Sequence, residues 1–144
     1  LPLLIADIKD DILNTILKEY DIEYIRPFVT CPGYIPNTDL PYLYSGAFAF
    51  FYTSFRESFG IPLLEAMACG TPVITSNTSS MPEIGGEKAI LTDPTNEKDI
   101  AEKLLLLEND PIFYQQQVDH GLERVKLFSW ENTARNLLSI YQNI

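Results

Sequence analysis

The sequence predicts an α/β fold, a Rossmann-like parallel sheet flanked by helices. Short apolar runs alternate with amphipathic segments along the chain, and Gly, Pro or Ser/Thr-rich stretches separate most of them. With 144 residues, of which 46% are hydrophobic, the chain can bury roughly two-thirds of its unfolded surface in a single core. We therefore expect residues 1–144 to form one domain.

The N-terminal part is expected to be a β/α unit. Residues 1–6 (LPLLIA) are strand-like, and a helix follows whose apolar stripe consists of Ile8, Ile12, Ile16 and Leu17. Residues 28–31 (FVTC), between two prolines, predict a short strand. Residues 39–45 predict a brief helix.

The middle of the chain predicts a strand, loop, helix and strand in succession. Residues 46–54 (GAFAFFYTS) are typical of a buried strand. A helix is expected to start at Pro62, where the missing N–H costs nothing, and to stop at Gly70, a residue suited to the left-handed position after a helix. Residues 71–76 (TPVITS) are again strand-like.

The C-terminal part is expected to be mostly helical. A Ser/Thr-rich loop leads to a helix start at Pro82, and residues 89–94 (AILTDP) predict one more strand. Helices are expected from Asn96 to Leu107 and from Asp110 onward, followed by a last one. The apolar faces expected on the last two helices are Tyr114, Val118, Leu122 and Val125, then Trp130, Ala134, Leu137, Leu138 and Tyr141.

The helix that starts at Pro62 predicts an anion site. The loop before it lies at the carboxyl end of a strand, where open α/β sheets bind ligands. The amides of Gly60, Ile61, Leu63 and Leu64 are expected to be free donors, and the helix dipole places roughly half a positive charge there. A diphosphate would suit this position.

Two glutamates, Glu57 and Glu65, flank this helix start with seven residues between them. Glu65 is the only polar side chain between Pro62 and Cys69, so it is expected to have a partner. A capping box is the structural alternative, although Glu65 lies one residue too late for it if Pro62 is the first helical residue. For Glu57, ordinary solvation beside Arg56 is the alternative.

Composition excludes several other functions. A formal net charge of −10 argues against nucleic-acid binding, which requires clustered cations. His120 is the only histidine and is expected on a polar helix face, so a His-containing triad and a multi-histidine zinc site are excluded, and we expect no metal. Cys31 and Cys69 are expected to be reduced thiols, which favours a cytoplasmic protein, and no apolar run is long enough to span a membrane.

The sequence argues against a phosphorylated receiver domain, a signalling module. Asp7, Asp10 and Asp11 follow the first strand as in a receiver's acidic cluster. The strand at residues 46–54 carries no aspartate at its end, where a receiver needs one.

The central segment resembles the Glu-x7-Glu signature of the retaining family 4 glycosyltransferases with the GT-B fold (glycosyl transferases group 1). The matching residues are Glu57, Phe59, Gly60, Pro62, Glu65, Ala66, Met67, Ala68, Gly70, Pro72 and Val73. Residues 33–54, 80–84, 90–94 and 128–134 are also similar to family segments, so the resemblance extends from about Val29 onward.

The resemblance implies that the chain is the donor-binding, C-terminal half of a two-domain enzyme. Glu57 would contact hydroxyls of the donor sugar and Glu65 those of the ribose. The turn toward the sugar and diphosphate would comprise Ser58, Phe59, Gly60 and Ile61. Tyr34 and Ile35 would lie beside the base, although residues 33–36 are equally well interpreted as a plain connection.

The implied reaction moves a hexose from a nucleoside diphosphate sugar to an acceptor with retention of configuration. The leaving phosphate itself takes the acceptor proton in front-face transfer, so Glu57 is expected to position the sugar, and no cofactor is needed. The acceptor would be held by an N-terminal domain. The sequence has no starting Met and is expected to be an inactive fragment that lacks this N-terminal domain and the first elements of its own domain. The complete enzyme is expected to be cytoplasmic, and to lie at the inner face of a membrane if the missing domain binds there.

Some expected partners are not identified by the sequence. The family usually supplies an Arg and a Lys to the diphosphate from a segment expected upstream; Arg26 and Arg56 are the nearest candidates and are interpreted as surface charges. Glu83 is interpreted as a first-turn residue favoured by the helix dipole rather than as a site residue. The base, sugar, acceptor and oligomeric state stay open.

Two other functions remain as alternatives. A GT-B-like sugar phosphorylase or epimerase would share the sheet and the anion site, but is not expected to show both glutamates in this framework. A non-catalytic Rossmann-like interaction domain would leave the motif without a use.

Overall fold

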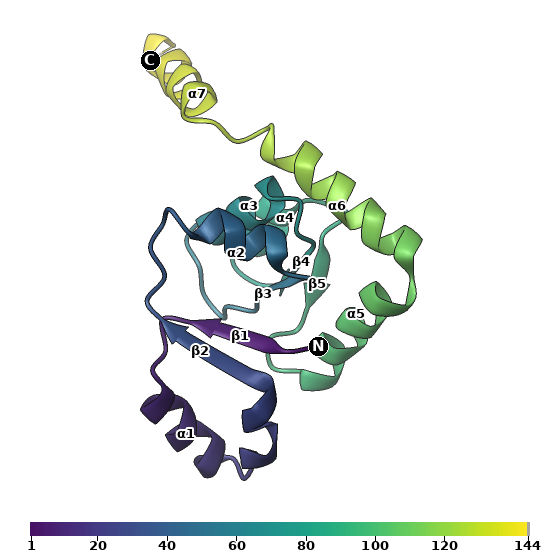
Figure 1. The fold of residues 1–144 in the computed structure, drawn as a ribbon. Helices are drawn as coiled ribbons and strands as arrows, with labels where there is room; N and C mark the ends of the chain where they lie inside the picture. The colour runs from purple at the N-terminus through teal and green to yellow at the C-terminus, as the bar shows by residue number, and fades with distance from the viewer. Residues whose placement is uncertain (144) are drawn as a thin grey trace. The chain divides into compact units, whose positions relative to one another are not determined.

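The computed structural model describes residues 1–143, which form two compact units, each described here by itself. The first unit comprises Leu1–Leu40 and the second begins at Pro41. Figure 1 labels the helices and strands of both. The expectation of one domain over the whole chain stays a prediction.

The first unit is a β-α-β arrangement. Strand β1 (Leu3–Ala6) is followed by α1 (Asp10–Glu19), a 3₁₀ helix η1 (Glu23–Phe28) and strand β2 (Val29–Gly33). The two strands pair in parallel, with Leu3 opposite Val29. A parallel pair needs a crossover connection of this length, which α1 and η1 supply.

The core of the first unit differs from the predicted stripe. Leu13 and Leu17, one helical turn apart on α1, are buried with Val29, whereas Ile12 and Ile16 are exposed. Each of these isoleucines lies one residue before a buried leucine, which rotates its side chain about 100° away from the core. Strand β2 also runs past Pro32, because its only partner in this sheet is β1 and an edge strand tolerates a missing N–H.

The second unit contains a three-stranded parallel sheet in the order β3-β4-β5. The strands are β3 (Phe50–Tyr52), β4 (Val73–Ser76) and β5 (Ile90–Thr92). Helix α3 (Ile61–Ala68) connects β3 to β4, and α4 (Met81–Gly85) connects β4 to β5. These parallel strands with helical connections confirm the predicted fold class.

Four further helices belong wholly or mainly to the second unit. They are α2 (Leu40–Gly46), which begins at the boundary, α5 (Glu97–Asn109), α6 (Pro111–Val125) and α7 (Trp130–Gln142). The side chains of Asn96 and Asp110 accept hydrogen bonds from the N–H groups of the second and third residues of α5 and α6, as predicted for helix starts.

The core of the second unit is centred on β4, whose four residues are all buried. Ile74 packs with Ile90 of β5 and Leu107 of α5. Phe48 stacks on Tyr114 of α6 with 5.0 Å between the ring centroids. Strand β4 is therefore covered on both faces, which is typical of parallel sheets.

Two helix faces differ from their predictions. On α6 the buried residues are Gln117 and Gly121, and Leu122 is exposed, because Gly121 allows the helix to approach Met67 of α3 closely. On α7 no residue is buried, so its apolar stripe faces solvent in the part of the chain that is described. Within residues 1–143, no helix combines the length and the apolar character that crossing a bilayer requires.

Candidate functional site

The turn that leads from β3 into α3 has a left-handed backbone at Gly60. Gly60 has φ +101° and caps α3, which begins at Ile61, one residue earlier than predicted. A Cβ added at Gly60 would lie 2.4 Å from the Cε of Met81, which is fully buried. The positive φ therefore requires glycine here, and any side chain would also displace the terminal methyl of Met81.

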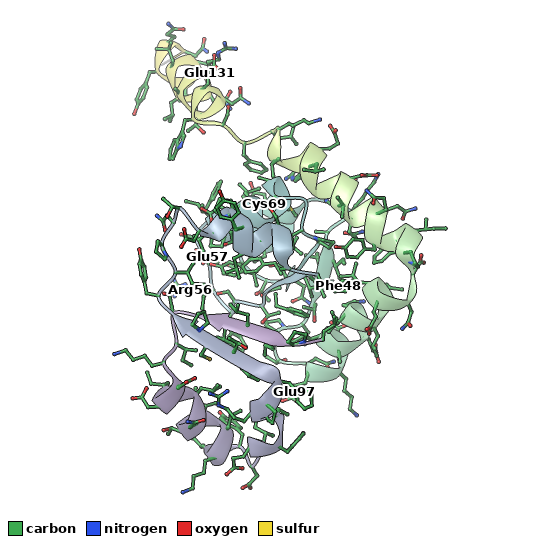
Figure 2. All side chains as sticks on the ribbon, in the orientation of Figure 1. Phe48, Arg56, Glu57, Cys69, Glu97 and Glu131 are labelled. Carbon is green, nitrogen blue, oxygen red and sulfur yellow. The ribbon has the colours of Figure 1, made fainter. Side chains whose placement is uncertain are left out.

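Glu57 precedes this turn, and its carboxylate is held by two protein donors. The Tyr52 hydroxyl donates to Oε2 at 2.7 Å, and the Ser58 N–H donates to Oε1 at 2.9 Å. The hydrogen bonds from the Tyr52 hydroxyl and the Ser58 N–H, together with the nearby N–H of Phe59, hold the pKa of the Glu57 carboxyl below its usual value. Figure 2 labels Glu57 beside Arg56.

Each oxygen of this carboxylate keeps room for a ligand. An ionised carboxylate offers about four acceptor positions over its two oxygens. Tyr52 and Ser58 use one on each oxygen. Glu57 is half-buried, so its remaining positions can accept two hydroxyl groups from a bound molecule.

Glu65 lies on the second turn of α3 and is exposed. Because α3 starts at Ile61, the capping-box position belongs to Leu63, so Glu65 is not a capping residue. Its Oε2 accepts a hydrogen bond from the Tyr44 hydroxyl at 3.3 Å. The predicted partner of this lone carboxylate is therefore a tyrosine of α2.

The surroundings of Tyr44 and Tyr52 raise the pKa values of both hydroxyls. Burial, together with the nearby Glu65 carboxylate, raises the pKa of Tyr44 to about 12. Burial and the hydrogen bond to Glu57 raise the pKa of Tyr52 to about 12. Each phenol therefore stays protonated and donates to its glutamate throughout the physiological range.

Two serines of the loop before α4 support the backbone of this turn. The Ser79 hydroxyl donates to the Glu57 carbonyl at 2.6 Å and accepts from the Glu57 N–H at 3.1 Å. The Ser80 hydroxyl donates to the carbonyls of Glu57 at 3.0 Å and Phe59 at 3.1 Å. Sequence reasoning missed both serines; the signal was a Ser/Thr-rich loop following the next strand of a parallel sheet.

The amides at the helix start are only partly available. The Leu63 N–H donates to the Gly60 carbonyl at 3.1 Å, so it is not the free donor that was predicted. The N–H groups of Gly60 and Ile61 form no hydrogen bond with residues 1–143. Phe59 and Ile61 are 43% and 54% exposed, which leaves this end of α3 open to an anion.

The residues predicted to lie beside the base belong to the first unit. Tyr34 is 75% exposed and Ile35 is half-buried, both just after β2. Their role toward a base stays a prediction.

The two candidate arginines differ. Arg26 is engaged, because its guanidinium donates to Asp10, Asn14 and the Val29 carbonyl. Arg56 is exposed and forms no ion pair with the described residues. The Arg26 guanidinium is therefore used within the first unit, whereas the Arg56 side chain is solvent-exposed.

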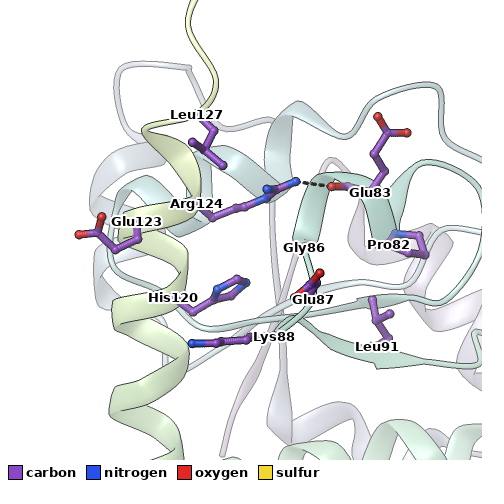
Figure 3. Close-up of a pocket in the computed structure, with 10 residues that line it drawn as sticks. All are labelled: Pro82, Glu83, Gly86, Glu87, Lys88, Leu91, His120, Glu123, Arg124 and Leu127. Carbon is purple, nitrogen blue, oxygen red and sulfur yellow. Dashed lines mark hydrogen bonds between the residues drawn. The ribbon is translucent and has the colours of Figure 1, made fainter.

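An open hollow lies between α6 and α4 in the second unit (Figure 3), and its lining includes neither Glu57 nor Glu65. Arg124 donates to the carbonyls of Ile84, at 2.9 Å, and Glu83. The Nε2 of His120 lies 2.8 Å from the Gly85 carbonyl. His120 therefore faces α4, whereas the sequence predicted a position on a polar helix face. These contacts satisfy carbonyls at the end of α4 and anchor that helix.

Metal-ligating side chains do not gather in the part of the chain that the structure describes: no group of three or more His, Cys, Asp or Glu residues could hold an ion. Cys31 and Cys69 are both free, as predicted.

The fold and this carboxylate-flanked helix start agree with the GT-B class of glycosyltransferases. The chain belongs to the family of glycosyl transferases group 1, whose profile matches residues 12–124. It is 42% identical over 110 residues to O-antigen chain mannosyltransferase B of Escherichia coli. The aligned region covers 76% of this chain and 29% of that protein. The resemblance found in the sequence is thereby confirmed.

Solved structures give the same class. Sucrose-phosphate synthase from Thermosynechococcus elongatus matches with a TM-score of 0.81 and 29% identity, over 98% of this chain and 38% of that one. Anabaena HepE in complex with UDP-glucose matches with a TM-score of 0.83 over 99% of this chain and 41% of that one; at 16% identity, this match shows the fold alone. The chain spans less than a third of the length of the mannosyltransferase that it matches.

Proposed function

We propose that this chain is the donor-binding part of a retaining hexosyltransferase that uses a nucleoside diphosphate sugar. The observation that carries the proposal is the carboxylate of Glu57, which keeps one acceptor position on each oxygen beside the open start of α3. Two neighbouring sugar hydroxyls could each donate to one of these positions, and such charge-assisted bonds are stronger than neutral ones.

The other predicted residues would each contact a different part of the donor. Glu65, exposed on the second turn of α3, would accept the ribose hydroxyls. The free N–H groups of Gly60 and Ile61 and the dipole of α3 would face the diphosphate. Tyr34 and Ile35 would lie beside the base, and Ser58 and Phe59 complete the turn.

The proposed chemistry needs no protein base and no cofactor. The helix start would stabilise negative charge on the leaving diphosphate, whose oxygen would take the proton of the acceptor hydroxyl. Glu57 would hold the sugar in place during transfer, which makes it the catalytic candidate. The acceptor would be held by a further domain of the complete protein.

Mannose and glucose are the first hexoses to test. Among the relatives, the 42% identical Escherichia coli protein is a mannosyltransferase, and the solved structure at 29% identity is a sucrose-phosphate synthase. Membership of the transferase family also favours transfer over the phosphorylase, epimerase and interaction-domain alternatives.

Calorimetry on the complete protein tests the donor assignment. GDP-mannose, UDP-glucose and ADP-glucose are titrated in turn, and we expect one of them to bind. Glu57→Gln should lower transfer more than nucleotide binding, whereas Glu65→Ala should weaken nucleotide binding itself. Glu97→Gln, in the first turn of α5, is the matched control and should change neither.

Three results would contradict the proposal. They are the absence of binding by all three donors, unchanged binding in Glu65→Ala, and equal loss of transfer and binding in Glu57→Gln. The configuration of the product, read from its anomeric NMR signal, tests retention separately. A product of inverted configuration would contradict the retaining mechanism but not the assignment of donor binding.

A further inference from the structure

The two glutamates of the candidate site share one feature that the sequence motif does not contain. Each carboxylate accepts a hydrogen bond from a tyrosine, Tyr52 on Glu57 at 2.7 Å and Tyr44 on Glu65 at 3.3 Å. Neither glutamate forms an ion pair with any residue from 1 to 143. The tyrosines are thus the side chains that hold these carboxylates.

The two tyrosines are joined through Phe50. The Tyr44 and Phe50 rings meet edge to face with centroids 5.2 Å apart, and the Phe50 and Tyr52 rings stack at 5.8 Å. Aromatic pairs at these distances contribute beyond the area they bury. Phe50 and Tyr52 are on β3, and Tyr44 is on α2 and 7% exposed, so the rings are attached to packed elements rather than to the loop.

We infer that Tyr52 and Tyr44, linked through Phe50, are positioning residues that fix the orientations of Glu57 and Glu65 toward the hydroxyl groups of the donor. This inference rests on the proposed function. Tyr52 occupies one acceptor position on Oε2 of Glu57, and so directs the other position of that oxygen to the ligand. Tyr44 does the same for Oε2 of Glu65.

The two contacts should differ in importance. The Tyr52 bond is short, as expected for a hydroxyl that donates to a carboxylate, whereas the Tyr44 bond of 3.3 Å is long. Glu57 is also half-buried, while Glu65 is exposed and can be reoriented by water. Loss of the Tyr52 hydroxyl should therefore have the larger effect.

The decisive experiment measures a sugar nucleotide and its parent nucleotide separately. In the complete protein, Tyr52→Phe keeps the ring and removes the hydroxyl. Calorimetry with GDP-mannose, UDP-glucose or ADP-glucose, whichever the natural protein binds, is compared with GDP, UDP or ADP. We expect about tenfold weaker binding of the sugar nucleotide and less than twofold change for the parent nucleotide.

The second tyrosine should give a different pattern. Tyr44→Phe should weaken the sugar nucleotide and the parent nucleotide alike, by about threefold, because Glu65 is assigned to the ribose that both contain. Tyr42→Phe is the matched control: Tyr42 lies on α2 and is 80% exposed, and it should bind both ligands as the natural protein does.

A double-mutant cycle separates positioning from a merely structural role. If Tyr52 acts through Glu57, then Tyr52→Phe should change binding less than twofold once Glu57→Ala is present. A full tenfold effect in that background would overturn the inference.

Acidic pH gives an independent readout. The groups around the Glu57 carboxylate are the Tyr52 hydroxyl of β3 and the N–H groups of Ser58 and Phe59, with Ser79 and Ser80 at its backbone, and none of these is charged. Without the Tyr52 hydroxyl the pKa of Glu57 should rise, so sugar-nucleotide binding should be lost at a higher pH than in the natural protein. An unmoved acidic limit would contradict the inference.

The outcomes distinguish this inference from the proposed function. If the natural protein binds a donor and Tyr52→Phe binds it equally well, the tyrosine inference fails and the donor assignment stands. If the natural protein binds none of the three donors, the proposed function fails and the inference fails with it.

Discussion

The loops before α3 and α4 have the same local pattern but use their polar groups differently. Each follows a strand of the second unit's sheet and leads into a helix with proline as its second residue. In the loop before α3, the Glu57 carboxylate keeps acceptor positions beyond those used by Tyr52 and Ser58. In the loop before α4, the hydroxyls of Ser79 and Ser80 are bonded to the backbone of the first loop.

The difference shows that a strand, loop and proline-started helix do not by themselves make a binding site. What matters is where the loop's polar groups point. The first loop presents a carboxylate, two free amides and a helix dipole. The serine hydroxyls of the second loop instead form hydrogen bonds that support the backbone of the first. Four predictions test this division, from the largest expected effect to the smallest.

Gly60→Ala should have the largest effect on stability. The new methyl group would combine a strained φ of +101° with a collision against the Met81 side chain. We expect the free energy of unfolding to fall by about 2 to 4 kcal/mol in urea denaturation. Gly46→Ala is the control and should not destabilise, since its added Cβ meets nothing within 4 Å. Equal stability of the two variants would show that the two loops are not interlocked.

Arg124→Ala should have the next largest effect, because it leaves the Ile84 and Glu83 carbonyls at the end of α4 without their donor. The expected loss is about 2 kcal/mol, measured in the same way. Arg135→Ala on α7 removes only an exposed ion pair with Glu131 and should cost less than about 0.5 kcal/mol. A similar cost for both would mean that α4 is held by packing alone.

Ser80→Ala should cost about 1 kcal/mol, since its hydroxyl donates to two carbonyls of the first loop. Ser139→Ala on α7, whose hydroxyl bonds to no described residue, should be neutral. The result that would break the comparison is a Ser80→Ala protein of unchanged stability that has lost donor affinity. The second loop would then be part of the site rather than its support.

The smallest effect is expected at a third loop, between β5 and α5, where carboxylates have only structural partners. Hydrogen bonds from Thr95 lower the pKa of Asp93, and the Asp93 N–H lowers that of Asp99. Because both pKa values are depressed in the folded state, the stabilisation is present above the unfolded pKa and is lost as pH falls through the folded values.

Asp99→Asn should therefore lower Tm slightly at pH 7 and match the natural protein once the pH has fallen below the folded-state pKa of Asp99. Thermal unfolding over this range measures the effect. A difference that persists at the acidic end would mean that the loss is steric rather than electrostatic.

Much of the fold could be predicted from the sequence, because its signals are local. Asn96 and Asp110 cap helices as their residue types predict, and Gly70 has the positive φ expected after a helix. The buried faces were less predictable. Which residues of α1 and α6 are buried depends on helix rotation against a partner, and a one-residue error exchanges Ile12 for Leu13.

The candidate site was predicted only for the residues that form its motif. Glu57 and Glu65 stand out in sequence by spacing and by an apolar context. Tyr44, Tyr52, Ser79 and Ser80 could not be found in this way, because their partners lie on other elements and depend on strand order and side-chain direction. The two tyrosines also lie in apolar stretches of the sequence, where aromatic residues are usually part of the core.

The serine bonds between the two loops have a thermodynamic consequence for ligand capture. Ser79 and Ser80 restrain the backbone of Glu57 and Phe59 through their hydrogen bonds. A donor that docks there would not have to order the loop, so little conformational entropy would be lost at that step. The same restraint limits how far the turn can reshape itself, so discrimination between hexoses would depend on hydroxyl geometry rather than on induced fit.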